Sequence, residues 1–207
     1  DGLKVQCYAW VPVDEKGKPR KPTGRILLCH GWEGYALNFS LLVSKALEAG
    51  YEVHAFDHLA HGHSDGTLSG LPVVLETLLT VAAYVTKTYG ALDVLVGHSL
   101  GGAGAAWDVA HQAIAPKRLV LLAPFYDTHT LSSLWAKAHF LSENIRAALQ
   151  KGLEDDTGKK FADFMPDALA PLLNAQRHLS VMIVHDKSDK ITAFKHSARM
   201  ATLGQRV

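Results

Sequence analysis

Residues 92–110 read LDVLVGHSLGGAGAAWDVA, an apolar run that leads into the pattern GHSLG at residues 97–101 and then into a stretch of small residues. A short apolar run bounded by turn residues is consistent with a strand buried on both faces of a sheet. The small residues that follow predict a helix. A serine at such a strand-to-helix turn takes a strained backbone conformation, and the flanking glycines let neighbouring backbone come close. Ser99 is therefore a candidate nucleophile.

Apolar runs on both sides of this stretch predict further strands, with amphipathic segments between them. The predicted strands cover residues 3–12, 24–30, 51–57, 118–124 and 179–186. Residues 38–47 and 72–89 repeat apolar positions at helical spacing, and each is followed by a glycine that favours a helix end. Alternating strands and helices predict an α/β fold with a doubly wound, mostly parallel sheet and right-handed crossovers.

Residues 127–179 break this alternation because they contain helical patterns without a convincing strand. Loops of that length without secondary structure are uncommon, so we expect a helical cap here. The predicted core is then discontinuous, with residues 1–126 and 180–207 in one domain. The cap is expected to supply much of a substrate pocket from its apolar side chains, which include Trp135, Phe140, Leu141 and Phe164.

The composition narrows the class of protein. The 207 residues have room for one domain, and 48% hydrophobic with 20% charged residues is typical of a globular chain. The 21 Lys and Arg nearly balance the 20 Asp and Glu, so nothing favours a nucleic-acid partner. Glu76 interrupts the apolar stretch 71–84, and no membrane span is expected. The first residues lack a signal-peptide pattern, which favours a cytoplasmic location. The sequence begins at Asp1 rather than at an initiator methionine, which is consistent with removal of an upstream segment.

Four motifs, in one order along the chain, resemble those of the α/β-hydrolase family. They are LLCHGWEG at 27–34, FDHLAHGHSDG at 56–66, GHSLGG at 97–102 and VHDKSDKIT at 184–192. The resemblance implies the α/β-hydrolase fold with a helical cap insertion. It also implies that the third motif is the family's nucleophile elbow, formed by Gly97, His98, Ser99 and Gly101.

Carried over position by position, the resemblance implies roles for individual residues. Ser99 becomes the nucleophile, and the backbone NH groups of Leu100 and Trp32 become the oxyanion hole. Asp189 becomes the acid, with Asp127 as the alternative because some relatives draw their acid from the strand before the cap. Asp186, where the family more often has glycine, is interpreted as a turn residue.

A serine hydroxyl needs a base, and no histidine of the sequence matches the position that the resemblance gives it. The family places this histidine on a loop after one further strand, and the residues after Asp189 are too few for both. His196 is interpreted as a surface residue of a helix, His98 as directed away from the serine, and His30 as a maker of structural hydrogen bonds. We favour the hypothesis that the intact protein continues past Val207 to its histidine. A serine-bearing scaffold without a base is the alternative.

The leading hypothesis is a serine hydrolase that cleaves a small carboxylic ester, or less favourably a thioester or amide, through an acyl-enzyme on Ser99. No cofactor or metal is expected, and the sequence does not determine the oligomeric state. One alternative is a noncatalytic binding module of the same fold. The other is a zinc-dependent hydrolase that uses His61, His63 and Asp65, because HGHSDG at 61–66 is one residue short of the H-x-H-x-D-H metal signature of the metallo-β-lactamase family. Gly66 stands where that signature has its last histidine.

Overall fold

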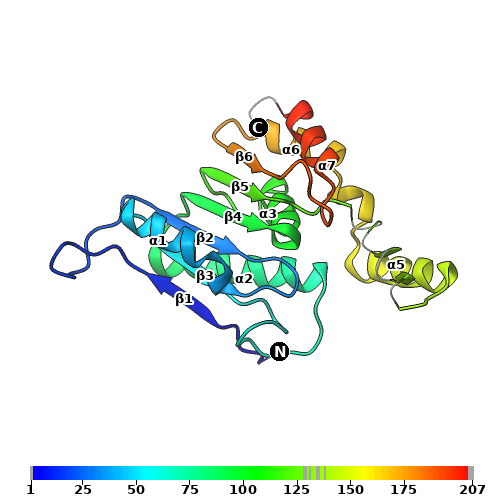
Figure 1. The fold of residues 1–207 in the computed structure, drawn as a ribbon, viewed down its shortest axis with the longest axis horizontal. Coiled ribbons are helices and arrows are strands. Elements are labelled where there is room, and N and C mark those ends of the chain that lie inside the picture. Colours follow the sequence, from blue (N-terminus) through cyan, green and yellow to red (C-terminus); the bar gives the residue numbers. More distant parts are fainter. Residues whose placement is uncertain (1, 128–129, 131, 134–135, 138, 205–207) are drawn as a thin grey trace.

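A computed structural model of the protein describes residues 2–127, 130, 132–133, 136–137 and 139–204, and Figure 1 shows its fold. Trp135, which the sequence assigns to the cap, lies outside these residues. The described residues form a six-stranded sheet in the order β1-β3-β2-β4-β5-β6. Its strands are β1 (Cys7–Trp10), β2 (Arg25–Cys29), β3 (Glu52–Phe56), β4 (Val94–His98), β5 (Arg118–Leu122) and β6 (Ser180–Val184).

The sheet is parallel except for β1, which pairs antiparallel with β3. Every strand lies within a run that the sequence predicts as a strand, except that β4 extends one residue further, to His98. The prediction of a mostly parallel α/β sheet is therefore confirmed. The helices that lie between strands include η1 (Ala36–Phe39), α1 (Ser40–Glu48), α2 (Leu71–Tyr89), α3 (Ser99–Ala110), α5 (Glu143–Thr157), η2 (Phe161–Phe164) and α6 (Pro166–Ala175). Helix α7 (Phe194–Leu203) follows β6.

Successive residues of each strand face opposite sides of the sheet, and both sides are buried near its centre. Leu27 on β2 pairs with Leu95 on β4, which pairs in turn with Leu119 on β5. These three leucines belong to a core cluster that also contains residues of α2, α3 and α6. The next residue on β2, Leu28, belongs instead to the cluster under α1. The near-continuous apolar strands of the sequence thus reflect a sheet that is covered by helices on two faces.

Helix α2 begins with Pro72 in its first turn and ends before Gly90, whose φ of 108° few other residues adopt. By length and composition alone, its 19 residues could cross a membrane, and it is the one helix of the described chain that meets that test. In the fold, however, its apolar side chains pack in the interior of the protein. Val74, Leu78, Val81 and Val85 are all buried. The helix is therefore placed as a core element of the α/β fold.

The segment predicted as a cap contains two kinds of helix. Helix α5 is set apart from the sheet in Figure 1, and the Ser142 hydroxyl accepts a hydrogen bond from the NH of Ile145 at its start. Helix α6 packs differently, because Leu169 and Leu173 are buried in the main core cluster beside residues of α3. Residues 127–179 thus include a helix that covers the sheet as well as one that stands away from it.

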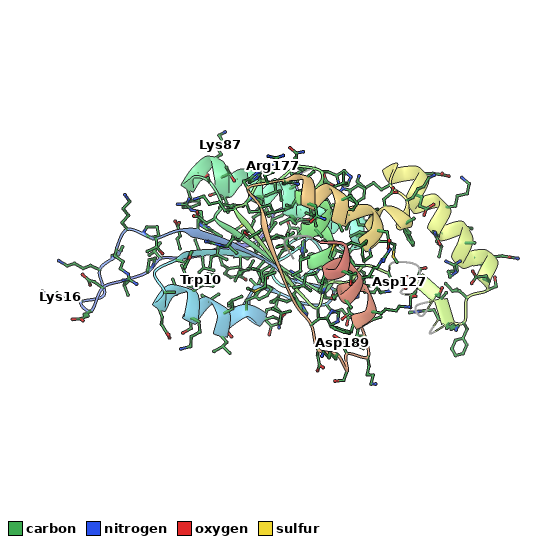
Figure 2. The ribbon with its side chains drawn as sticks, turned by 90° about the horizontal axis from the view of Figure 1, so that it is seen from above. Trp10, Lys16, Lys87, Asp127, Arg177 and Asp189 are labelled. Carbon is green, nitrogen blue, oxygen red and sulfur yellow. The ribbon has the colours of Figure 1, made fainter. Side chains whose placement is uncertain are left out.

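The parallel strands all end at one edge of the sheet, where the loops after them gather. In Figure 2, Asp127 and Asp189 lie toward this end of the molecule, and Lys16 lies at the opposite end. Clefts at the carboxyl ends of parallel strands are the usual place for ligands in α/β folds. The candidate residues follow β2, β3, β4, β5 and β6, so the topology brings them to one edge.

Candidate active site

Ser99 stands at the junction between β4 and α3, with a backbone φ of 52°. This left-handed conformation is uncommon for a residue with a side chain and costs on the order of 1–3 kcal/mol. The NH of Phe125, on the loop after β5, donates a hydrogen bond of 3.0 Å to the Ser99 carbonyl and helps to hold the turn. Ser99 as a residue is partly exposed at the carboxyl edge of the sheet.

The turn needs glycine because backbone from β2 runs directly beside it. A Cβ on Gly101 would stand 2.2 Å from the carbonyl oxygen of His30, and one on Gly97 would stand 2.7 Å from the carbonyl oxygen of Gly101. A Cβ on Gly31 would stand 2.8 Å from the Cβ of Ser99. Real Cβ atoms do not come this close to other atoms. Gly31 and Gly101 therefore allow the end of β2 and its loop to lie against the serine turn, and Gly97 allows β4 to lie against the start of α3.

The loop after β2 presents backbone NH groups next to Ser99. The NH of Glu33 is occupied by Nε2 of His61, at 3.1 Å, and the NH of Gly34 by the carbonyl oxygen of Gly31, also at 3.1 Å. The NH of Trp32 precedes these two. At the other side of the serine, Leu100 lies in the first turn of α3, where backbone NH groups have no acceptor within the helix. Both NH groups predicted for the oxyanion hole therefore belong to segments adjoining Ser99.

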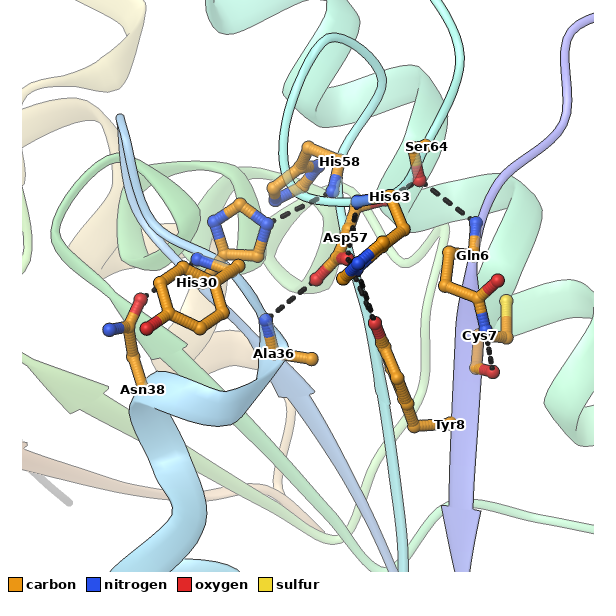
Figure 3. A network of polar contacts seen from close by, with 11 residues as sticks. Gln6, Cys7, Tyr8, His30, Ala36, Asn38, Asp57, His58, His63 and Ser64 are labelled. Atoms are coloured by element: carbon orange, nitrogen blue, oxygen red, sulfur yellow. Dashed lines mark hydrogen bonds and ion pairs between the residues drawn. The ribbon is translucent and has the colours of Figure 1, made fainter.

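The histidine-rich stretch after β3 is organised around the buried carboxylate of Asp57, as Figure 3 shows. Its two oxygens accept hydrogen bonds from the NH of Ala36 at 2.7 Å, the NH of His63 at 2.9 Å and the hydroxyl of Tyr8 at 3.1 Å. The hydroxyl of Ser64 donates to the Asp57 carbonyl at 2.6 Å. The carboxylate thus ties together β1, the helix after β2 and the loop after β3.

The zinc alternative places a metal between His61, His63 and Asp65, but the structure gives each of them another partner. His61 contacts Glu33 and Leu59 through its two ring nitrogens. The His63 ring is 81% exposed beside Asp57 and Tyr8, and a carboxylate oxygen of Asp65 accepts from the NH of Lys4. Within the described residues, no group of three or more His, Cys, Asp or Glu side chains is arranged to hold a metal ion.

Asp189 lies on the loop after β6, and its carboxylate is held by donors from the residues that follow. The NH groups of Ile191 and Thr192 donate to Oδ1 at 2.7 and 2.9 Å, and the Thr192 hydroxyl donates to Oδ2 at 2.8 Å. These bonds, led by the one from the Thr192 NH, lower the pKa of Asp189, although partial burial opposes them. Asp186 accepts from the NH and hydroxyl of Ser188, which is the turn role expected for it.

The loop after β6 also contains a buried histidine that sequence reasoning missed. The His185 side chain is 1% exposed, and its Nδ1 lies 2.7 Å from the Ser197 hydroxyl on α7. Its Nε2 lies 3.0 Å from the carbonyl oxygen of Thr192 and 3.6 Å from Oδ2 of Asp189. His185 therefore braces the loop that carries Asp189. In the sequence His185 falls near the end of the run 179–186, which is predicted as a strand, so no pattern distinguished it as a loop residue.

Asp127 and His196 meet across the loop after β5 and helix α7. Nε2 of His196 lies 3.4 Å from Oδ2 of Asp127, and the histidine side chain is only 12% exposed. The interpretation of His196 as a surface residue is therefore wrong. Partial burial tends to raise the pKa of Asp127, but hydrogen bonds from Thr130 and the nearby His196 outweigh it and lower that pKa. The sequence separation of the two residues hid this pair.

His30 has the structural role that the sequence indicates. Its Nδ1 lies 2.7 Å from the Gly31 carbonyl oxygen, and its Nε2 accepts a 2.9 Å hydrogen bond from the NH of His58. A ring that accepts at Nε2 is neutral, and burial indeed lowers the pKa of His30. His98 is exposed at the end of β4. None of the described residues forms a hydrogen bond with the Ser99 hydroxyl.

A hollow of about 550 Å³ opens beside the loop after β2. We call it the Trp32 hollow, and it lies between the loops after β2 and β3 and the approach to α2. Its walls include Trp32, Glu33, Tyr35, His61, Leu68 and Ser69. The rings of Trp32 and His61 meet edge to face, with centroids 5.9 Å apart.

Comparisons with known proteins agree with this architecture. The model of the alpha/beta hydrolase family matches residues 26–202. A monoacylglycerol lipase of Mycolicibacterium smegmatis is 28% identical over 105 residues, which is 49% of this chain. The human monoglyceride lipase is 29% identical over 128 residues, which is 60% of this chain.

Among solved structures, Est1E of Butyrivibrio proteoclasticus with bound ferulic acid superposes with a TM-score of 0.71 and 19% identity, covering 100% of this chain and 84% of that one. The monoacylglycerol lipase of Paleococcus ferrophilus gives a TM-score of 0.65 and 19% identity, covering 99% and 85%. At these identities the superpositions concern the fold. The sequence matches span 35% of the length of the mycobacterial lipase and 40% of the human one.

Proposed function

The chain belongs to the alpha/beta hydrolase family, and from this premise we propose that the protein cleaves carboxylic esters through an acyl-enzyme on Ser99. The observation that carries the proposal is the left-handed Ser99 at the end of β4, with the Gly31 backbone packed against its side chain. In this family such a turn is the nucleophile elbow. The names of the sequence relatives, monoacylglycerol and monoglyceride lipase, support an ester as the substrate.

In the proposed reaction the Ser99 oxygen attacks the carbonyl carbon of the ester while a histidine base takes the hydroxyl proton. The bond to the alcohol then breaks, and the same histidine returns the proton to the leaving oxygen. Water repeats the sequence on the acyl-enzyme and releases the carboxylic acid. Besides Ser99, the proposed triad consists of this histidine base and a carboxylate that orients it.

The negative charge that develops on the carbonyl oxygen needs donors fixed in advance. We assign this role to the NH groups of Leu100 and Trp32, since one lies at the start of α3 and the other follows Gly31, which packs on Ser99. The start of a helix also carries partial positive charge, which favours an oxyanion there. Losing one such donor typically costs about 10²-fold to 10³-fold in kcat.

We assign the acid to Asp189. The hydrogen bonds that lower its pKa keep it ionised at neutral pH, as a carboxylate must be to orient a histidine and stabilise its charged form. Asp127 is the second candidate, and a specific contact favours it, because His196 already lies beside it. Substituting each acid separately distinguishes the two assignments.

A noncatalytic binding module of the same fold is the competing function. It is favoured by one observation, the absence of a hydrogen bond between Ser99 and any histidine of the described residues. The two functions differ in whether the Ser99 hydroxyl reacts.

The deciding experiment is labelling by a fluorophosphonate probe, together with hydrolysis of p-nitrophenyl acetate, in the protein as its gene encodes it. We expect labelling and hydrolysis in the parent protein and neither in Ser99→Ala. Ser40→Ala is the matched control because Ser40 is an exposed serine that also begins a helix, α1. An unlabelled parent protein, or an active Ser99→Ala variant, would refute the proposed mechanism.

A further inference from the structure

We propose that the Trp32 hollow binds the acyl arm of the ester and selects uncharged, apolar acyl groups. The inference rests on the proposed function, because it concerns the ester attacked by Ser99. It places the acyl group against the loops after β2 and β3. The sequence instead assigned the substrate pocket to the helical segment of residues 127–179.

The sheet order places the hollow and the acid on opposite sides of the nucleophile. Strands β2 and β3, whose loops form the hollow, lie on one side of β4, which ends at Ser99. Strand β6, whose loop carries Asp189, lies two positions away on the other side. Gly31 packs on Ser99, and the next residue, Trp32, forms a wall of the hollow. Trp32 is thus the residue through which the serine turn and the hollow are connected along the chain.

The chemistry of ester cleavage decides which arm of the substrate points each way. The leaving oxygen must receive a proton from the base, and the base is oriented by the acid. With Asp189 as that acid, the alcohol arm extends toward β5 and β6. The acyl arm occupies the remaining substituent position of the carbonyl carbon, away from the base. The oxyanion is held on the β2 side by the Trp32 NH, so we place the acyl arm next to it, along the Trp32 side chain and into the Trp32 hollow.

The walls of the hollow suit an apolar group. Trp32, Tyr35 and Leu68 line the same hollow and are 48%, 47% and 80% exposed, so three large apolar side chains there are in contact with water. An acyl chain bound between them removes this surface from water, and that burial is favourable in proportion to its area. The volume of about 550 Å³ lies within the range of ordinary ligand sites.

The polar groups of the hollow disfavour an anionic acyl group. Glu33 is the one charged side chain among the lining residues within the described part of the chain. A second carboxylate on the acyl arm would be repelled by it. The Ser69 hydroxyl also lines the hollow, and it is buried without a hydrogen-bond partner among the described residues. It offers a donor to a neutral polar substituent.

The test uses p-nitrophenyl esters, so that the alcohol arm stays constant while the acyl arm changes from acetate to butyrate to octanoate. We expect Leu68→Ser to raise KM for the octanoate by about fivefold or more relative to KM for the acetate, since the apolar contact between Leu68 and the acyl chain is lost. Leu41→Ser is the matched control, because Leu41 is 75% exposed on α1 and does not line the hollow. Both substitutions are at exposed positions, where stability changes little.

A charge test uses the same leaving group with an anionic acyl arm, p-nitrophenyl hemisuccinate. Glu33→Gln should raise kcat/KM for the hemisuccinate relative to the butyrate by about threefold to fivefold, because one like charge is removed. Equal effects of Leu68→Ser on acetate and octanoate would overturn the inference. So would effects that follow the size of the alcohol arm in a series of butyrate esters. Failure of the parent protein to cleave any ester would instead refute the proposed function.

Discussion

The imidazole of His61 accepts a hydrogen bond of 3.1 Å from the backbone NH of Glu33, a residue 28 positions earlier in the chain. The other ring nitrogen, Nδ1, lies 3.1 Å from the carbonyl oxygen of Leu59 in its own loop. A neutral ring with its proton on Nδ1 satisfies both contacts. His61 thereby joins the loop after β3 to the loop after β2, whose Trp32 NH is assigned to the oxyanion hole.

Replacing His61 tests whether this contact positions the oxyanion loop. We expect His61→Phe to lower kcat for p-nitrophenyl acetate by about fivefold to tenfold with little change in KM, because a lost hydrogen bond and an unpaired NH cost about 1 kcal/mol or more. His61→Gln offers a side-chain oxygen to the Glu33 NH and should recover part of the loss. The acetate is used because it is too short to depend on the Trp32 hollow. Equal kcat values for the Phe variant and the parent would contradict the role.

Gly101 tests the close approach of backbone at the serine turn. A Cβ there would stand 2.2 Å from the His30 carbonyl oxygen and 2.7 Å from that of Cys29, and neither backbone atom can move freely. We expect Gly101→Ala to lower the free energy of unfolding by about 3 kcal/mol, as for overpacking in a tight core. Urea unfolding measures this through the transition midpoint.

Gly152 provides the control for the same chemical change. It lies inside α5, and a Cβ there would meet nothing within 4 Å. Gly152→Ala should raise the stability of α5 by about 0.5–1 kcal/mol, since alanine favours the helix more than glycine does. A destabilised Gly152→Ala variant, or a Gly101→Ala variant with the parent's midpoint, would show that the steric explanation is wrong.

Substitution of the two candidate acids separates their roles. We expect Asp189→Asn to reduce kcat by about 10³-fold to 10⁴-fold, because an amide orients the wrong form of the histidine ring. Asp127→Asn should reduce kcat by less than about tenfold and act mainly on the contact with His196. The measurement is the steady-state rate on p-nitrophenyl acetate, with urea unfolding to separate activity from stability. A larger loss of kcat in Asp127→Asn than in Asp189→Asn would show that Asp127 is the acid.

The sheet was predictable from sequence because its signal is local. Each strand is a short apolar run, and a strand buried on two faces requires that pattern wherever it lies. The serine turn was predictable for a similar reason, since the close approaches at Gly97 and Gly101 leave no space for a side chain. Strand ends were less well defined, as β1 begins at Cys7 although the apolar run starts at Leu3.

The contacts between loops were not predictable, because they join residues with no shared pattern. His61 with Glu33 and Asp127 with His196 depend on which loops the sheet order brings together. Side-chain identity alone suggested a metal site for the histidine-rich stretch. The structure uses the same stretch to bind backbone groups around Asp57. The packing of helix α6 on the core could not be predicted either, since it depends on the path of the chain.

Asp108 offers a test that is independent of catalysis. Its side chain is buried on α3, and Oδ2 has no hydrogen-bond partner among the described residues. Burial raises the pKa of Asp108 to about 7, and the charge of Lys159 offsets this effect only in part. In the unfolded chain the carboxyl has its ordinary pKa near 3.8.

The folded state therefore binds the Asp108 proton more tightly than the unfolded state does, and stability falls as pH rises from about 4 to about 7. Below about pH 4 the Asp108 carboxyl is protonated in both the folded and the unfolded state. Above about pH 7 it is ionised in both states, and the folded state bears the full cost of burying the charge. Asparagine carries no charge at any pH, so Asp108→Asn should match the parent near pH 4 and exceed its stability by a few kcal/mol at pH 8. Urea unfolding of both proteins across this range measures the difference. A difference that does not change with pH would show that burial does not raise the pKa of Asp108 in the folded protein.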